Sequence, residues 1–168
     1  MSAWGCLPGR YLREDQGRPA KSSAHGTTVV DGEQTFELPR FADAVQCVAV
    51  EVKCAEPLRM GEERYYAAEI VLASDFVNGR VGLQVSLRDL DEWERCLLAL
   101  QAGEGAQWPT GGRSAWLEVV PEDPVQLTVH DSPSTQIAVH VPIDVAADWL
   151  EQNRLRLDAV RRAVATSS

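Results

Sequence analysis

The stretch "VNGRVGLQVSLRDLDEWERCLLAL", residues 77–100, changes its hydrophobic period in the middle. In its first half, apolar residues alternate with other residues up to Leu87, which is the pattern of a half-buried strand. From Leu90 onward, apolar residues recur every three or four positions, which is the pattern of one helix face. Ser86 and Asp89 have the spacing of a capping box. The stretch therefore predicts a strand that runs directly into a helix, with the helix folded back over its own sheet.

Short runs of alternating apolar and polar residues on both sides of this stretch predict further strands. Alternation means that one face of each strand meets the core while the other meets water, and this favours antiparallel pairing. Proline, aspartate and serine between the last runs supply the turns. The predicted strands cover residues 35–41, 45–54, 65–74, 114–120, 125–131 and 135–141.

The last part of the chain predicts a second helix that begins near Asp144. Leu150 and Leu157 belong to its apolar stripe, and Asn153 interrupts that stripe. The predicted fold class is therefore α+β. We expect an antiparallel meander sheet of about seven or eight strands, with one central and one C-terminal helix packed on one face.

Composition divides the chain into two parts. Residues 1–32 hold five of the twelve glycines and show no hydrophobic period, so we expect a flexible leader there. Residues 33–168 are long enough to bury a core of their own, and they predict a single α+β domain.

The charge balance narrows the class of partner. The formal net charge is -9 at pH 7, and the acidity belongs to the predicted domain, since the leader holds more basic than acidic residues. An acidic surface does not displace counterions from nucleic acids or anionic membranes, so we expect neither as a partner. No apolar run reaches the ~18 residues that a membrane span needs. The predicted partner is a basic protein, such as a toxin, and the predicted location is the cytoplasm.

No motif in the sequence indicates catalysis, a cofactor or a metal. The four cysteines form no CxxC pair, and their spacing to the histidines is not that of a metal site. The glycine-rich segment "GEGAQWPTGGRS", residues 103–114, follows the predicted helix, whereas a phosphate loop would precede one. The carboxylates of "DLDEWE" can pair with arginines along the helix. We therefore predict a non-catalytic protein without cofactor or metal.

One exposed group in the predicted sheet could serve as an interface. Leu117 and Val119 take the inward positions of their strand, which turns the tryptophan and the acid between them outward. If "DSPST", residues 131–135, forms the next turn, His130 pairs with Gln136, and the two imidazoles lie about 10 Å or more apart. Exposed aromatic residues beside acids are typical of interfaces, although a loop or the leader could instead cover the tryptophan. The candidate interface residues are Trp116, Glu118, His130 and His140.

Three longer segments carry a resemblance to a known family: "AAEIVLASDFVNGRVGLQVSLRDLDEWERCLLALQAGEGAQW", "WLEVVPEDPVQLTVHD" and "VPIDVAADWLEQNRLRLDAVRRA". With their "FVNGR" turn, "DLDEW" helix opening and "DWL", they resemble a family of uncharacterised bacterial α+β domains from GC-rich genomes, over about residues 35–165. That resemblance implies the fold only. The layout of strands and helix more loosely resembles the immunity proteins of the WapI type, which protect a bacterium against its own toxin. This second resemblance assigns no catalytic residue to the chain.

These observations favour a non-catalytic cytoplasmic protein-interaction domain. It would act as an immunity or antitoxin protein whose acidic surface masks the basic surface of a toxin. The alternative is a small-ligand-binding or regulatory domain with a pocket between the sheet and the helices. An enzyme ranks third, because the sequence holds no catalytic motif.

Overall fold

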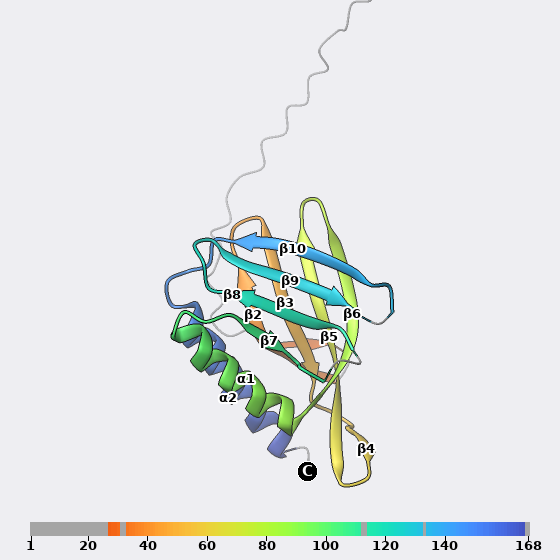
Figure 1. The fold of residues 1–168 in the computed structure, drawn as a ribbon. Helices are drawn as coiled ribbons and strands as arrows, with labels where there is room; N and C mark the ends of the chain where they lie inside the picture. The colour runs from red at the N-terminus through yellow and green to blue at the C-terminus, as the bar shows by residue number, and fades with distance from the viewer. Residues whose placement is uncertain (1–26, 31–32, 112–113, 133, 167–168) are drawn as a thin grey trace, which may run out of the picture.

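The computed structural model describes residues 27–30, 33–111, 114–132 and 134–166 (Figure 1). Its elements, in chain order, are β1 (Thr27–Val30), β2 (Glu33–Ala42), β3 (Gln46–Lys53), β4 (Leu58–Met60), β5 (Glu63–Ser74), β6 (Asn78–Ser86), α1 (Leu87–Gln101), β7 (Ala106–Trp108), β8 (Trp116–Val120), β9 (Val125–Asp131), β10 (Ile137–Ile143) and α2 (Trp149–Thr166).

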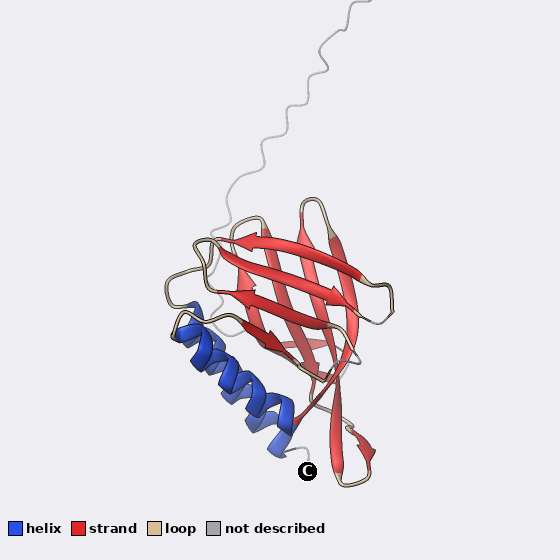
Figure 2. Ribbon diagram, viewed as in Figure 1, coloured by secondary structure: helices blue, strands red, loops and turns tan. Residues whose placement is uncertain are grey.

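Within these residues the strands form two antiparallel sheets, which Figure 2 shows crossing one in front of the other. Sheet A has the order β1-β2-β3-β5-β4, with β6 also paired to β5. Sheet B has the order β10-β9-β8-β7. The predicted α+β class, with antiparallel strands and two helices packed against them, is confirmed. The alternation of apolar and polar residues along the chain did not indicate that the strands divide into two sheets. The division coincides with α1: the strands before this helix form sheet A, and those after it form sheet B.

The predicted passage from strand to helix lies at the end of β6. Ser86 is the N-cap of α1: its hydroxyl accepts a hydrogen bond from the Asp89 N–H (3.3 Å). The Asp89 carboxylate in turn accepts one from the Ser86 N–H (2.7 Å), which completes the capping box. The helix ends before Gly103, whose φ of 81° is a left-handed conformation that glycine adopts without strain.

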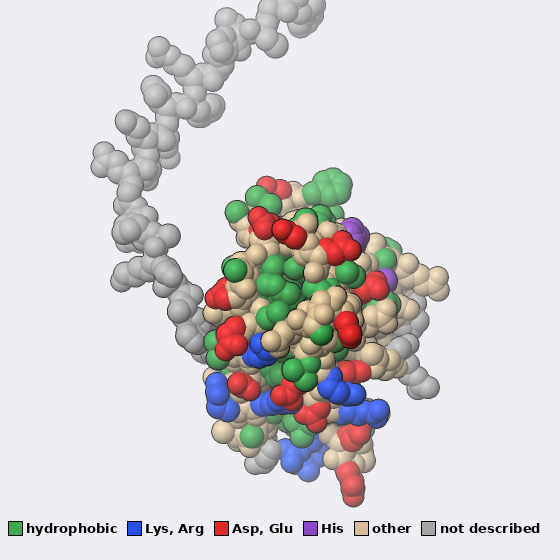
Figure 3. All heavy atoms as spheres, turned by 60° about the vertical axis from the view of Figure 1, so that its left-hand side comes forward, with side chains coloured by type: hydrophobic (Ala, Val, Ile, Leu, Met, Phe, Trp, Pro, Cys, Tyr) green, Lys and Arg blue, Asp and Glu red, His purple; other side chains and the backbone are tan. Residues whose placement is uncertain are grey.

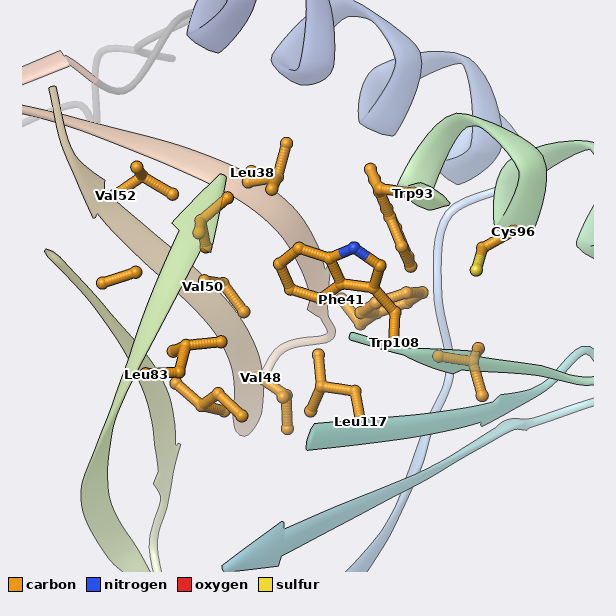
Figure 4. Close-up of a cluster of buried hydrophobic side chains, with 14 of the residues drawn as sticks. Leu38, Phe41, Val48, Val50, Val52, Leu83, Trp93, Cys96, Trp108 and Leu117 are labelled. Carbon is orange, nitrogen blue, oxygen red and sulfur yellow. The ribbon is translucent and has the colours of Figure 1, made fainter. Parts of the chain in front are cut away.

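The core lies between the two sheets and is closed on one side by the helices. Figure 4 shows side chains of β2, β3 and β6 meeting those of α1, β7 and β8. At its centre, Trp93 of α1 packs edge-on against Phe41 of β2 (6.4 Å between ring centroids) and against Trp108 of β7 (5.6 Å). The three rings connect α1 to both sheets.

Helix α2 is joined to sheet A by a buried amide. The Asn153 side chain accepts a hydrogen bond from the Arg40 N–H (2.8 Å) and donates one to the Arg40 carbonyl (3.1 Å). It donates another to the Trp149 carbonyl (2.9 Å). Pairing of β1 with β2 ends at Phe36, so Asn153 meets the backbone of β2 beyond the end of β1. The residue that interrupts the predicted apolar stripe therefore has a defined partner.

The boundary of the leader differs from the sequence prediction. Residues 27–30, which were assigned to the leader, form β1 and pair with Glu33–Phe36 of β2. All four are β-branched (TTVV), which favours a strand and outweighs the glycine-rich composition around them. Pairing therefore begins before Glu33. Residues 1–26 lie outside the described residues.

The cysteines of the described segments are all free thiols. Burial raises the pKa of the Cys54 and Cys96 thiols to about 11, so both remain protonated at neutral pH. Neither α1 nor α2 combines the length and apolarity needed to cross a bilayer.

Candidate functional site

The outer face of sheet B carries the four candidate interface residues. Strand β8 alternates as predicted: Leu117 and Val119 are buried in the core, whereas Trp116 and Glu118 are only half-buried on the outer face. In the register of the sheet, Trp116 lies opposite His130 of β9. The tryptophan and the acid therefore share one surface with the histidine.

The Trp116 indole and the His130 imidazole form a stack. Their ring centroids are 3.7 Å apart and their planes differ by 5°. The imidazole thus covers one side of the indole, and both rings have few rotamers left to lose when a partner binds. The aromatic stack is therefore preformed before any partner binds.

Glu118 connects this stack to strand β7. One carboxylate oxygen accepts a hydrogen bond from the Gln107 amide (3.3 Å), and the other lies 3.6 Å from His130 Nε2. His130 Nε2 is buried and has no hydrogen-bond partner among the described residues. The contact becomes an ion pair only when His130 is protonated, so the Glu118 charge is otherwise free to attract a cation.

His140 lies nearer to His130 than the sequence predicted. The predicted pairing of His130 with Gln136 is wrong. The centre of the turn lies one residue further along the chain, which shifts every pairing partner by two residues. His130 therefore pairs with Ala138, and His140 with Thr128. Gln136, with a left-handed φ of 59°, closes this turn by donating its N–H to the Asp131 carbonyl (2.9 Å). The two histidines become diagonal neighbours, with Cα atoms about 7–8 Å apart.

The His140 ring is held by its own strand neighbours. Its Nε2 lies 2.9 Å from Gln126 Oε1, and its Nδ1 lies 3.2 Å from Thr128 Oγ1. The side-chain contacts of Gln107, Gln126 and Thr128 could not be predicted from the sequence, because they depend on the register and on partners in other strands. Within the described ranges, no group of three or more His, Cys, Asp or Glu side chains is placed to hold a metal ion.

The charged residues of the segment that carries this face are nearly all acidic. Among residues 104–148, Arg113, which lies outside the described residues, is the single Lys or Arg. Arginines of α2 are engaged elsewhere, as Arg161 is by Asp91 (2.7 Å) and Glu94 (2.9 Å) of α1. Figure 3 shows Lys and Arg gathered in the lower part of the molecule and His in the upper part. The acidic residues of this segment are Glu104, Glu118, Glu122, Asp123, Asp131, Asp144 and Asp148.

A cleft of about 1080 Å³ is the second candidate site. It lies between β5, β6, the first turns of α1 and the loops next to β8 and β9. Its lining carries charges of both signs, such as Lys53, Arg88 and Glu92. Glu92 accepts a hydrogen bond from the Thr110 N–H (3.3 Å) across one wall. The position of this cleft could not be predicted from the sequence, because its residues come from segments far apart in the chain.

Comparison with known proteins identifies one family. A model of a family of unknown function (DUF5959) matches residues 36–165, which span the chain from β2 to α2. No curated protein and no solved structure matches the chain. The predicted resemblance to an uncharacterised family is confirmed, and the match includes the outer face of sheet B and the cleft.

Proposed function

The chain belongs to this family of unknown function, and we propose that it is a non-catalytic protein-interaction domain that binds a basic protein through the outer face of sheet B. The observation that carries the proposal is the preformed stack of Trp116 on His130 in a segment whose charged residues are nearly all acidic. None of the four strands of sheet B contains Lys or Arg.

Both parts of this surface favour binding. A half-buried indole fixed by its neighbour supplies apolar contact area at a small cost in side-chain entropy. The surrounding carboxylates attract a positively charged partner, which speeds the encounter and makes it sensitive to salt.

The partner that we propose is a toxin with a basic surface, and the domain is its immunity or antitoxin protein in the bacterial cytoplasm. The acidic segment supports this role, and so does the resemblance of the layout to WapI-type immunity proteins. The sequence also contains no motif for a reaction of its own. A toxin gene beside the gene for this chain would identify the protein to test.

Trp116→Ala and Glu118→Lys are each expected to weaken the complex with the basic toxin encoded next to this chain by about 1 kcal/mol or more. The first removes the aromatic contact, and the second reverses the charge beside it. Titration calorimetry at low salt measures the effect. Glu62→Lys is the control, because it makes the same charge change at the exposed turn between β4 and β5. A double Trp116→Ala, Glu118→Lys variant that binds like the wild type would show that sheet B is not the interface.

The cleft supports a second function, the binding of a small ligand. Its volume of about 1080 Å³ suits a metabolite, and its mixed charges suit a zwitterionic one. A zwitterionic metabolite that binds only the native state is expected to raise the melting temperature in a thermal-shift panel. A Cβ at Gly82 meets no atom within 4 Å, so Gly82→Phe fills the cleft without a clash at its base. An unchanged shift in Gly82→Phe would place the ligand elsewhere.

A further inference from the structure

The turn between β5 and β6 holds an aromatic side chain in solvent. Phe76 is 95% exposed, the largest exposed fraction among the large hydrophobic side chains that the structure describes. Isolated exposed apolar residues are common on proteins, so exposure alone assigns no role. The geometry of the turn and of its neighbour gives the second line of evidence.

The turn that carries Phe76 is fixed by Ser74. The Ser74 hydroxyl accepts hydrogen bonds from the Val77 N–H (2.8 Å) and the Phe76 N–H (3.3 Å). The Ser74 N–H donates to the Val77 carbonyl (3.0 Å), and the Asn78 amide donates to the Ser74 carbonyl (2.8 Å). The backbone of Phe76 is thus held in place while its ring remains in water.

A second apolar turn lies beside the first. Gln46 and Ser74 are the last pair of β3 and β5, so the turn at Asp43–Val45 emerges next to the turn at Asp75–Val77. Val45 is 62% exposed, and a hollow of about 360 Å³ lies between the two turns. We call these six residues, 43–45 and 75–77, the turn patch.

The turn patch is negatively charged. The Asp43 carboxylate accepts hydrogen bonds from the Val45 N–H (2.8 Å) and the Gln46 N–H (2.9 Å), and the first of these lowers the pKa of Asp43. Asp75 is exposed. The cation that lines the hollow, Arg40, is paired with Glu37 (2.7 Å). An exposed aromatic side chain therefore lies beside carboxylates.

We propose that the turn patch is an anchor of the protein interface, in which Phe76 inserts into an apolar pocket of a partner protein whose rim carries Lys or Arg. The carboxylates of the turn patch complement a basic rim, and the phenyl ring of Phe76 fits an apolar pocket of its own size. The inference rests on the proposed function, because it assigns the same basic partner. The Gln46 side chain donates to the Pro142 carbonyl of β10, so the patch is continuous with the edge of sheet B.

A display library of a small folded scaffold with a randomised surface, selected on the full chain, tests this proposal. We expect the recovered binders to carry a net positive charge. Phe76→Ser is expected to lower the affinity of these binders for the chain about tenfold or more. The melting temperature of this variant should equal that of the wild type, because the exposed ring makes few contacts. Leu98→Ser is the control: Leu98 is 58% exposed on α1, and the affinity should stay within about twofold.

The same binders, measured on Trp116→Ala, distinguish this inference from the proposed function. Binders that need Phe76 but not Trp116 support the turn patch and count against the face of sheet B. Binders that need Trp116 but not Phe76 support the face of sheet B and count against the turn patch. Acidic binders, or a selection that yields none dependent on Phe76, would overturn the assignment of the turn patch.

Discussion

Replacing Trp93 with alanine is expected to lower the free energy of unfolding by about 3–5 kcal/mol. The Trp93 side chain is fully buried, and its ring contacts Phe41 in sheet A and Trp108 in sheet B. Its removal leaves a cavity where α1 meets both sheets, and atoms on all sides lose contacts that they cannot regain by collapse. Urea denaturation followed by circular dichroism measures the loss as a lower midpoint at unchanged slope.

Two phenylalanine variants provide a matched control. The Trp93 indole N–H has no hydrogen-bond partner among the described residues, whereas the Trp108 indole N–H donates to the Asp89 carbonyl (2.7 Å). Trp93→Phe removes an unsatisfied donor, but Trp108→Phe removes a hydrogen bond. Trp108→Phe is therefore expected to destabilise the domain more than Trp93→Phe does. A loss below about 1 kcal/mol for Trp93→Ala would refute this description of the core.

Asn153→Ala is expected to cost about 2–4 kcal/mol of unfolding free energy. Truncation leaves both the N–H and the carbonyl of Arg40 without the partner that Asn153 supplies. Unsatisfied backbone groups beneath a helix cannot readily recruit water, so most of their desolvation cost remains. Urea denaturation again measures the change.

Gln152→Ala is the control for this substitution. Gln152 is the exposed neighbour of Asn153 on α2, and its amide donates to the Asp148 carboxylate just before the helix (3.1 Å). Its truncation is expected to change stability by less than about 0.5 kcal/mol. Equal stability of the two alanine variants, or a more stable Asn153→Leu, would mean that the buried amide does not stabilise the fold.

Local signals in the sequence predicted most of the elements but not their partners. They missed the short strands β1, β4 and β7, and α2 begins at Trp149, five residues after the predicted start near Asp144. The boundary between β6 and α1 was predictable because Ser86 and Asp89, which set it, are three residues apart. The contact of Asn153 with Arg40 was not, because the two residues are 113 positions apart. The sequence showed only that a polar residue interrupts an apolar stripe. The division into two sheets also depends on pairing between distant segments.

The candidate interface illustrates the same distinction. Alternation alone placed Trp116 and Glu118 on one face, because side chains of a strand point to opposite faces in turn. His130 and His140 stayed on that face although the pairing was wrong, since a shift of two residues preserves parity. The exposure of Phe76 was not predictable, because it depends on where the β5–β6 pairing ends.

We expect the Asn153 amide also to protect the domain against aggregation. An open strand edge offers N–H and carbonyl groups that can template pairing with another chain. Strand β1 covers the edge of β2 only as far as Phe36. Further along β2, Asn153 forms hydrogen bonds with the backbone N–H and carbonyl of Arg40. Detachment of α2 would free this edge and would also uncover the part of the core that Leu157 and Val160 fill. Self-association on mild heating should therefore begin with the release of one helix, at a temperature below that of global unfolding.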